Sequence, residues 1–146
     1  MTADATAMPL QARFDRVLAD VPRSGTGTLG RNPEIRWRLQ PDDLADLHRR
    51  QVAILNAGVA RLEPGGRLVY STCSLEPEEN VDVVNEVLAS SGNLRLRKCR
   101  VELERLRDDG ELAWEDLDSL VSGPFLRTLP GVHPCDGFFA AIIGRD

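Results

Sequence analysis

The alternation of apolar and polar positions divides the chain into segments of strand length and segments with a helical period. Three apolar runs have the length of buried strands: residues 14–21, 67–72 and 138–143. Apolar side chains repeat at helical spacing over residues 41–62 and again over residues 77–88. The pattern therefore predicts strand, helix, strand and helix in succession, followed by a last strand near the end of the chain.

This order predicts an α/β fold. Two strands joined by a helix at this spacing form a parallel pair with a right-handed crossover. Leucines alternate with arginines over residues 94–97, which indicates a possible edge strand. Residues 107–123 are acidic and weakly periodic, so we expect a loop with one short helix there. Since no repeat or linker divides the chain, residues 1–146 are expected to form a single domain.

Composition agrees with an ordinary soluble protein. Of the 146 residues, 42% are hydrophobic and 28% charged. No apolar stretch approaches the roughly 20 residues needed to cross a bilayer, and the first residues lack the basic and apolar regions of a secretory signal. The three cysteines have no metal-like spacing, which favours a reducing cytoplasm. We therefore predict a cytoplasmic protein without membrane association.

The charge distribution leaves RNA open as a partner. The net charge of −5 argues against nucleic acid, but residues 102–118 alone carry eight acidic residues and two arginines. Elsewhere a basic cluster surrounds a tryptophan: Arg23, Arg31, Arg36 and Arg38 with Trp37. Such a cluster can hold single-stranded RNA. On composition alone, a solvated loop is the commoner explanation.

Two candidate chemical groups close the first two predicted strands. Asp20 ends the first strand, and Cys73 follows the second within Ser71-Thr72-Cys73-Ser74. If these strands are neighbours, about 5 Å apart, the carboxylate and the thiol face one crevice at their carboxyl ends. The positive end of a helix beginning just after Cys73 would favour a thiolate, which suits covalent catalysis on an electron-poor ring. The alternative is a buried, inert cysteine, the usual state of a lone cysteine in an apolar strand.

Other candidate residues have structural explanations. His133 and Cys135 lack the paired ligands that zinc requires, so we expect no metal site and assign His133 to ordering the loop before the last strand. Trp37 could stack on a base or anchor its own loop. Glu78 and Glu79 resemble paired catalytic acids, but their place in the first turn of a predicted helix explains them better.

The chain resembles the Sun/Fmu-type RNA cytosine-C5 methyltransferases, the family of small-subunit ribosomal RNA methyltransferase B. Residues 14–37, with Asp20-Val21-Pro22-Arg23-Ser24-Gly25-Thr26-Gly27, resemble the family's fourth motif. Residues 64–80 resemble its sixth motif, and residues 129–140 its C-terminal strand. The resemblance implies the second half of a Rossmann-like S-adenosylmethionine-dependent methyltransferase fold, with a mixed sheet and an antiparallel C-terminal strand.

The resemblance also implies residue roles. Cys73 would be the nucleophile that adds to C6 of cytosine, so that C5 can take a methyl group from S-adenosylmethionine. Asp20 would lie in the cofactor and cytosine site and stabilise the activated base. Asp4 would match an acid near the adenine of the cofactor, although a solvated terminal aspartate explains it equally well. The RNA, ribosomal by resemblance, would contact Arg23, Arg31, Arg36 and Trp37.

Two departures from the family pattern qualify these roles. The family usually has a second cysteine after the proline of the fourth motif, which assists product release. Arg23 stands there, and arginine can act neither as a base nor as a thiol. The family's glycine-rich cofactor loop precedes the segment that this chain matches. We therefore expect a partial domain, with doubtful cofactor binding by this chain alone.

The same departure predicts an open edge on the strand at residues 14–21. Val17, Leu18 and Val21 are expected to be partly uncovered there, and an apolar strand edge invites pairing with another chain. We predict a homodimer, a domain swap or a partner chain. The leading hypothesis is a truncated RNA cytosine-C5 methyltransferase, and the alternatives are a non-catalytic RNA-binding remnant and a half-domain that completes another chain.

Overall fold

Six strands form one mixed sheet in the computed structural model, which describes residues 4–7, 9 and 11–146. The strands are β1 (Phe14–Asp20), β2 (Leu62–Thr72), β3 (Leu94–Arg97), β4 (Val121–Ser122), β5 (Phe125–Thr128) and β6 (Phe138–Arg145). The order across the sheet is β1-β2-β6-β5-β4, and β3 also pairs with β6. Only the β1–β2 pair is parallel, so the predicted parallel pair and the antiparallel last strand are both present.

Within the described residues, four α-helices accompany the sheet: α1 (Ile35–Arg38), α2 (Pro41–Ala60), α3 (Val81–Ala89) and α4 (Cys99–Asp108). Short 3-10 segments lie at η1 (Ala5–Ala7), η2 (Thr26–Thr28), η3 (Pro77–Glu79) and η4 (Leu117–Leu120). The long helix α2 begins where predicted, because Pro41 occupies its first turn and Gln40 and Asp43 form a reciprocal capping box. None of the helices in the described part of the chain is long and apolar enough to cross a membrane.

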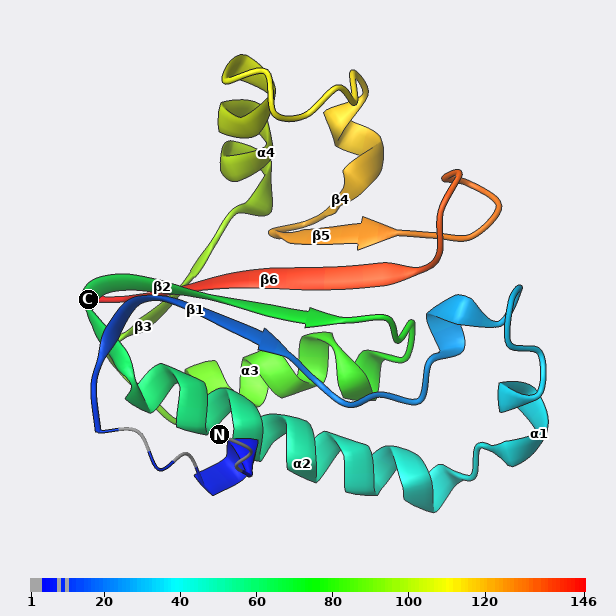
Figure 1. Ribbon diagram of the computed structural model, residues 1–146, viewed down its shortest axis with the longest axis horizontal. Coiled ribbons are helices and arrows are strands. Elements are labelled where there is room, and N and C mark those ends of the chain that lie inside the picture. Colours follow the sequence, from blue (N-terminus) through cyan, green and yellow to red (C-terminus); the bar gives the residue numbers. More distant parts are fainter. Residues whose placement is uncertain (1–3, 8, 10) are drawn as a thin grey trace.

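The main core lies between the sheet and the pair α2 and α3. Figure 1 shows α2 on the β1 side of the sheet and α4 beyond β5, on the other side. Large core side chains come from the central strands and from both helices: Leu55, Leu62, Leu68, Tyr70, Val83, Val84, Phe139 and Ile143. Neighbouring residues of β5 point to opposite faces, so Phe125 joins this core while Leu126 packs on a second cluster under α4 and η4.

Two predicted elements differ from the structure. The helix expected over residues 77–88 is divided, because Pro77–Glu79 form the 3-10 segment η3 and the side chain of Asn80 caps α3 at the N–H of Val81. Helix α4 was not predicted. It forms in a highly charged segment because its buried face carries Cys99 and Leu103, while i,i+4 ion pairs support its exposed face.

Strand β1 has one free edge, because β2 is its only neighbour in the described sheet. Leu18 is 71% exposed and Val17 is partly covered by α2. The expectation of a buried strand is therefore wrong for this chain, and the open edge is present. Val21 was expected to be partly uncovered, but it is buried. It lies beyond the end of β1, donates its N–H to the carbonyl of Ser71 and is only 1% exposed.

Candidate active site

The candidate site lies at the carboxyl ends of β1 and β2. Asp20 stands opposite Ser71 in the parallel ladder, and Ser71 Oγ donates to Asp20 Oδ1 at 3.2 Å. Cys73 follows immediately after β2 and is half-buried. The structure thus brings Asp20 and Cys73 to one end of two adjacent strands, where α/β folds place their ligands.

Three segments meet around the backbone of Cys73. The carbonyl oxygen of Cys73 accepts from the N–H of Gly27 at 2.8 Å, and the carbonyl of Gly27 accepts from the N–H of Gly137 at 2.8 Å. The Cys73 loop is therefore held by two glycine-containing segments. A 3-10 segment begins at Pro77 and helix α3 only at Val81, so the structure does not place the start of an α-helix just after Cys73.

Glu79 is the residue of this site that the sequence did not reveal. Its side chain is fully buried, at 0% exposure, and its carboxylate oxygens accept hydrogen bonds from Ser24, Gln51 and Ser74. It therefore connects the segment before Gly27, helix α2 and the Cys73 loop. The sequence signal for this role was weak: Ser24 and Ser74 lie in the two motifs, and each has a hydroxyl that can donate to a carboxylate.

Tyr70 supports the backbone of Glu79 from the core. Its hydroxyl donates to the backbone carbonyl of Glu79 at 2.6 Å, and its ring packs edge-on against Phe139 in the core. Burial, and then the negative charge of Glu79, raise the pKa of Tyr70. The phenol therefore keeps its proton and holds η3 in place as a donor.

The predicted RNA-binding residues lie on the segment between β1 and α2, at exposed positions. Arg23 is exposed and forms no ion pair with Asp20, although both residues are described. Arg31 forms an ion pair with Asp136, so its guanidinium braces the loop before β6. On α1, Arg36 is exposed and Trp37 is 82% exposed. Trp37 therefore does not anchor its loop, and its ring is free to contact a ligand.

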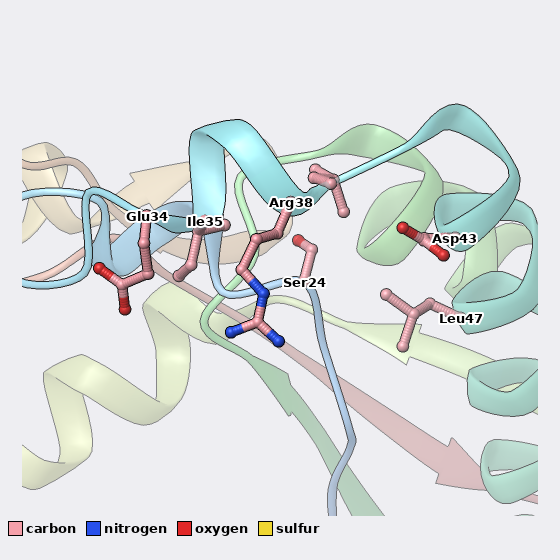
Figure 2. Close-up of a pocket in the computed structure, with 7 residues that line it drawn as sticks. Ser24, Glu34, Ile35, Arg38, Asp43 and Leu47 are labelled. Atoms are coloured by element: carbon pink, nitrogen blue, oxygen red, sulfur yellow. The ribbon is translucent and has the colours of Figure 1, made fainter.

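A cavity of about 320 Å³ opens between α1 and the start of α2. Figure 2 shows the guanidinium of Arg38 extending into it, with Ser24 behind and Leu47 to one side. The remaining lining residues are Glu34, Ile35, Leu39 and Asp43. Because Ser24 also binds Glu79, this cavity adjoins the network that supports Cys73.

Asp4 and His133 lie outside this group. Asp4 precedes η1, which packs against α2, and its Oδ1 accepts from the N–H and hydroxyl of Thr6. These hydrogen bonds, with the charge of Arg50, lower the pKa of Asp4.

His133 accepts from the N–H of Leu129 at Nδ1 and donates from Nε2 to the carbonyl of Ser119, so it orders the loop before β6 as expected.

The described residues contain no group of three or more His, Cys, Asp or Glu side chains that could hold a metal ion.

Asp20 has one carboxylate oxygen free to accept a hydrogen bond. Only Oδ1 has a partner in the described structure, which leaves Oδ2 available to an N–H group of a ligand. Asp20 therefore offers a free acceptor at the end of β1, and the two predicted cofactor residues, Asp4 and Asp20, have separate hydrogen-bond partners.

The sequence is similar to a family of ribosomal RNA methyltransferases along almost its whole length. Residues 1–144 match the family model described as 16S rRNA methyltransferase RsmB/F. The "Ribosomal RNA small subunit methyltransferase B" of Klebsiella pneumoniae subsp. pneumoniae is 37% identical over 129 residues, which cover 88% of this chain and 26% of that protein. The chain thus spans about a quarter of the length of the curated relatives that it matches.

Solved structures agree in fold. A methyltransferase homolog protein from Pyrococcus horikoshii has a TM-score of 0.64 and 30% identity, with 92% of this chain and 40% of that chain covered. NSun6 from Pyrococcus horikoshii, determined with SFG, has a TM-score of 0.74 and 24% identity, with 99% and 34% covered. The predicted fold class, part of a Rossmann-like methyltransferase fold with a mixed sheet, is confirmed.

Proposed function

The chain belongs to the RsmB/F family of 16S ribosomal RNA methyltransferases, and from this premise we propose that it carries the nucleophile-bearing part of an RNA cytosine-C5 methyltransferase. The observation that carries the proposal is the position of Cys73 and Asp20 at the ends of adjacent parallel strands. Cys73 is half-buried, so its thiol lies neither in the closed core nor in open solvent.

The reaction begins with addition of the Cys73 thiolate to C6 of cytosine. The S–C6 bond forms as the electron pair of the 5,6 double bond moves to C5, which then takes the methyl group. S-adenosylmethionine supplies that methyl group when bound. The double bond is restored when a base takes the C5 proton and Cys73 departs with the electron pair of the S–C6 bond. In the family a second cysteine assists this release, and Arg23, which stands in its place, cannot take the proton, so we expect release from this chain to be slow. Throughout, Asp20 Oδ2 would accept an N–H of the exocyclic 4-amino group of cytosine and hold the base.

The cofactor, S-adenosylmethionine, follows from the family. Asp20 fits a cofactor contact because its carboxylate is exposed at the end of β1. Asp4 fits less well, since its hydrogen bonds remain within residues 4–6 beside α2. We propose that this chain provides part of the cofactor site and that Asp20, with one carboxylate oxygen free, contacts the cofactor.

The proposed RNA substrate, ribosomal by family, is supported by exposed basic and aromatic residues on the segment between β1 and α2. Arg23, Arg36 and Trp37 are exposed there, and Arg31 is held by Asp136. Guanidinium groups bind phosphates, and an exposed indole can stack on an unpaired base. The three cysteines are free thiols, which suits the reducing cytoplasm where we place the protein.

Two observations favour the alternative functions. Arg23 occupies the place of the releasing cysteine, which favours a non-catalytic RNA-binding remnant. The open edge of β1, with Leu18 exposed, favours a half-domain that pairs with a partner chain or with a second copy. The first alternative predicts RNA binding without methyl transfer, and the second a tight protein partner without either ligand.

The test is covalent capture. RNA containing 5-fluorocytosine and S-adenosylmethionine are incubated with the protein, because fluorine replaces the C5 proton whose loss frees Cys73. A covalent complex is expected that is absent in Cys73→Ser and retained in Cys135→Ser, where the thiol removed is exposed. Absence of the complex, together with absence of cofactor binding by calorimetry, would remove the enzymatic proposal for this chain.

A further inference from the structure

The carboxylate of Glu79 accepts four hydrogen bonds in a fully buried position. Oε1 accepts from the backbone N–H of Ser24 at 2.8 Å and from Gln51 Nε2 at 3.0 Å. Oε2 accepts from the hydroxyls of Ser24 and Ser74. A carboxylate has about four lone-pair sites, so all of them are used, and they are filled by neutral donors.

The orientation of the Gln51 side-chain amide shows that the acceptors around it determine which groups donate. Its Nε2 donates both to Glu79 and to the carbonyl of Pro22 at 2.9 Å, while its own Oε1 is buried without a partner among the described residues. An unpaired buried acceptor is costly. The amide nevertheless adopts this orientation, because the reverse one would turn its oxygen toward two other acceptors.

The hydroxyl protons follow the same direction. Ser74 gives its single proton to Glu79, so Ser74 Oγ serves as an acceptor for the N–H of Glu76 at 3.1 Å and for Thr26 Oγ1 at 3.3 Å. Thr26 Oγ1 in turn accepts from the N–H of Leu75 at 3.0 Å. The residues directly after Cys73 are thus tied to Glu79 by hydrogen bonds whose donors and acceptors are fixed.

We infer that Glu79 is a positioning residue for Cys73, an inference that rests on the proposed covalent function. Glu79 holds Ser24 on one side and Ser74 on the other, and Gly27 holds the carbonyl of Cys73 between them. The carboxylate thereby fixes the backbone that carries the thiol at the strand ends where Asp20 also lies. It touches neither the thiol nor the substrate, and it acts through its neighbours.

Glu79→Gln is the variant that tests this role, because it keeps the volume and removes the charge. An amide cannot accept from four donors, so the Ser24 and Ser74 hydroxyls must reverse when its NH2 group faces them. The matched control is Glu78→Gln, whose side chain is exposed and makes no hydrogen bond in the described structure.

Two measurements decide the result. The first is the rate and pH profile of iodoacetamide alkylation at Cys73, measured by mass spectrometry relative to the exposed Cys135 of the same chain. The second is the rate of covalent complex formation with 5-fluorocytosine RNA. In Glu79→Gln we expect an altered Cys73 alkylation profile and complex formation slowed by about 10- to 100-fold, the scale of a nucleophile displaced by up to 1 Å. The RNA concentration giving half the maximal rate should not change.

If Glu79→Gln matches Glu78→Gln in both measurements, the inference is overturned. If the wild-type protein forms no RNA complex, the proposed function fails, and the alkylation profile alone decides the role of Glu79. If Glu79→Gln does not fold, Ser74→Ala removes one donor and leaves the other three. An unchanged Cys73 profile in that folded variant overturns the inference as well.

Discussion

Gly27 and Cys73 are joined backbone to backbone, with the N–H of Gly27 donating to the Cys73 carbonyl at 2.8 Å. The two residues are so close that a Cβ on Gly27 would lie 2.4 Å from that oxygen and 2.4 Å from the carbonyl oxygen of Gly137. Backbone atoms cannot move aside as a flexible side chain does. The position of the candidate nucleophile therefore depends on a residue without a side chain.

Gly27→Ala is expected to destabilise the protein by about 1–3 kcal/mol, the usual cost of forcing extra volume into a packed site. Urea unfolding monitored by fluorescence measures the change. Gly30→Ala is the matched control, because nothing lies within 4 Å of a Cβ at that position, and it should change the unfolding free energy by less than about 0.5 kcal/mol. Equal effects of the two substitutions would contradict the contact.

The sequence predicted the parts of the site that depend on strand pattern. Asp20 and Cys73 each follow an apolar run, and neighbouring parallel strands must bring their ends to one edge. The resemblance of residues 14–37 and 64–80 to two family motifs indicated the same pair. These signals are local in the chain, which is why they could be found without a structure.

The remaining parts depend on contacts between distant segments. Glu79 lies 55 positions from Ser24, and no local pattern shows that a helix-start acid turns inward to accept its hydrogen bonds. Helix α4 was not predicted for the same reason. Its sequence is highly charged, and Leu103 packs on residues of η4 that are distant in the chain. The exposure of Trp37 also required the structure, because both a stacking and an anchoring role fitted its sequence.

Arg23→Cys is expected to restore product release. Arginine cannot take up a proton at C5, whereas a cysteine thiol, with an ordinary pKa of about 8.5, can supply a thiolate. With unmodified RNA and cofactor, the wild-type protein should accumulate a covalent complex, and Arg23→Cys should release methylated RNA about 100-fold faster. Denaturing gels and methyl incorporation measure the two quantities. Arg50→Cys, an exposed position on α2, is the control that should release nothing extra.

His48 makes the stability depend on pH. Its Nδ1 faces the carbonyl of Glu78 at 2.6 Å and its Nε2 faces the carboxylate of Glu86 at 2.8 Å, so the protonated ring, which donates from both nitrogens, satisfies both acceptors. Burial lowers the pKa of His48, but these hydrogen bonds and the charges of Glu86 and Asp82 outweigh it, so the pKa lies above its ordinary value of 6.5.

A raised pKa in the folded state means that the stabilisation is complete below about pH 6.5 and is lost as the pH rises through the folded-state pKa. We expect the free energy of unfolding to fall by less than about 1 kcal/mol between pH 6 and pH 8, the range of a partly exposed ion pair. Urea titrations at several pH values measure it. His48→Gln should flatten this part of the profile, and an unchanged slope in that variant would assign the dependence to other groups.

The open edge of β1 predicts association through Leu18. Burying one leucine side chain contributes about 1.5–3 kcal/mol, which corresponds to about 10- to 100-fold in a dissociation constant. Leu18→Lys should therefore weaken a homodimer by at least that factor, because lysine on an edge strand opposes pairing. Val132→Lys, at an equally apolar and 69% exposed position in the loop before β6, should leave association unchanged. Light scattering across a concentration series measures both variants, and a wild-type protein that stays monomeric throughout would contradict association through this edge.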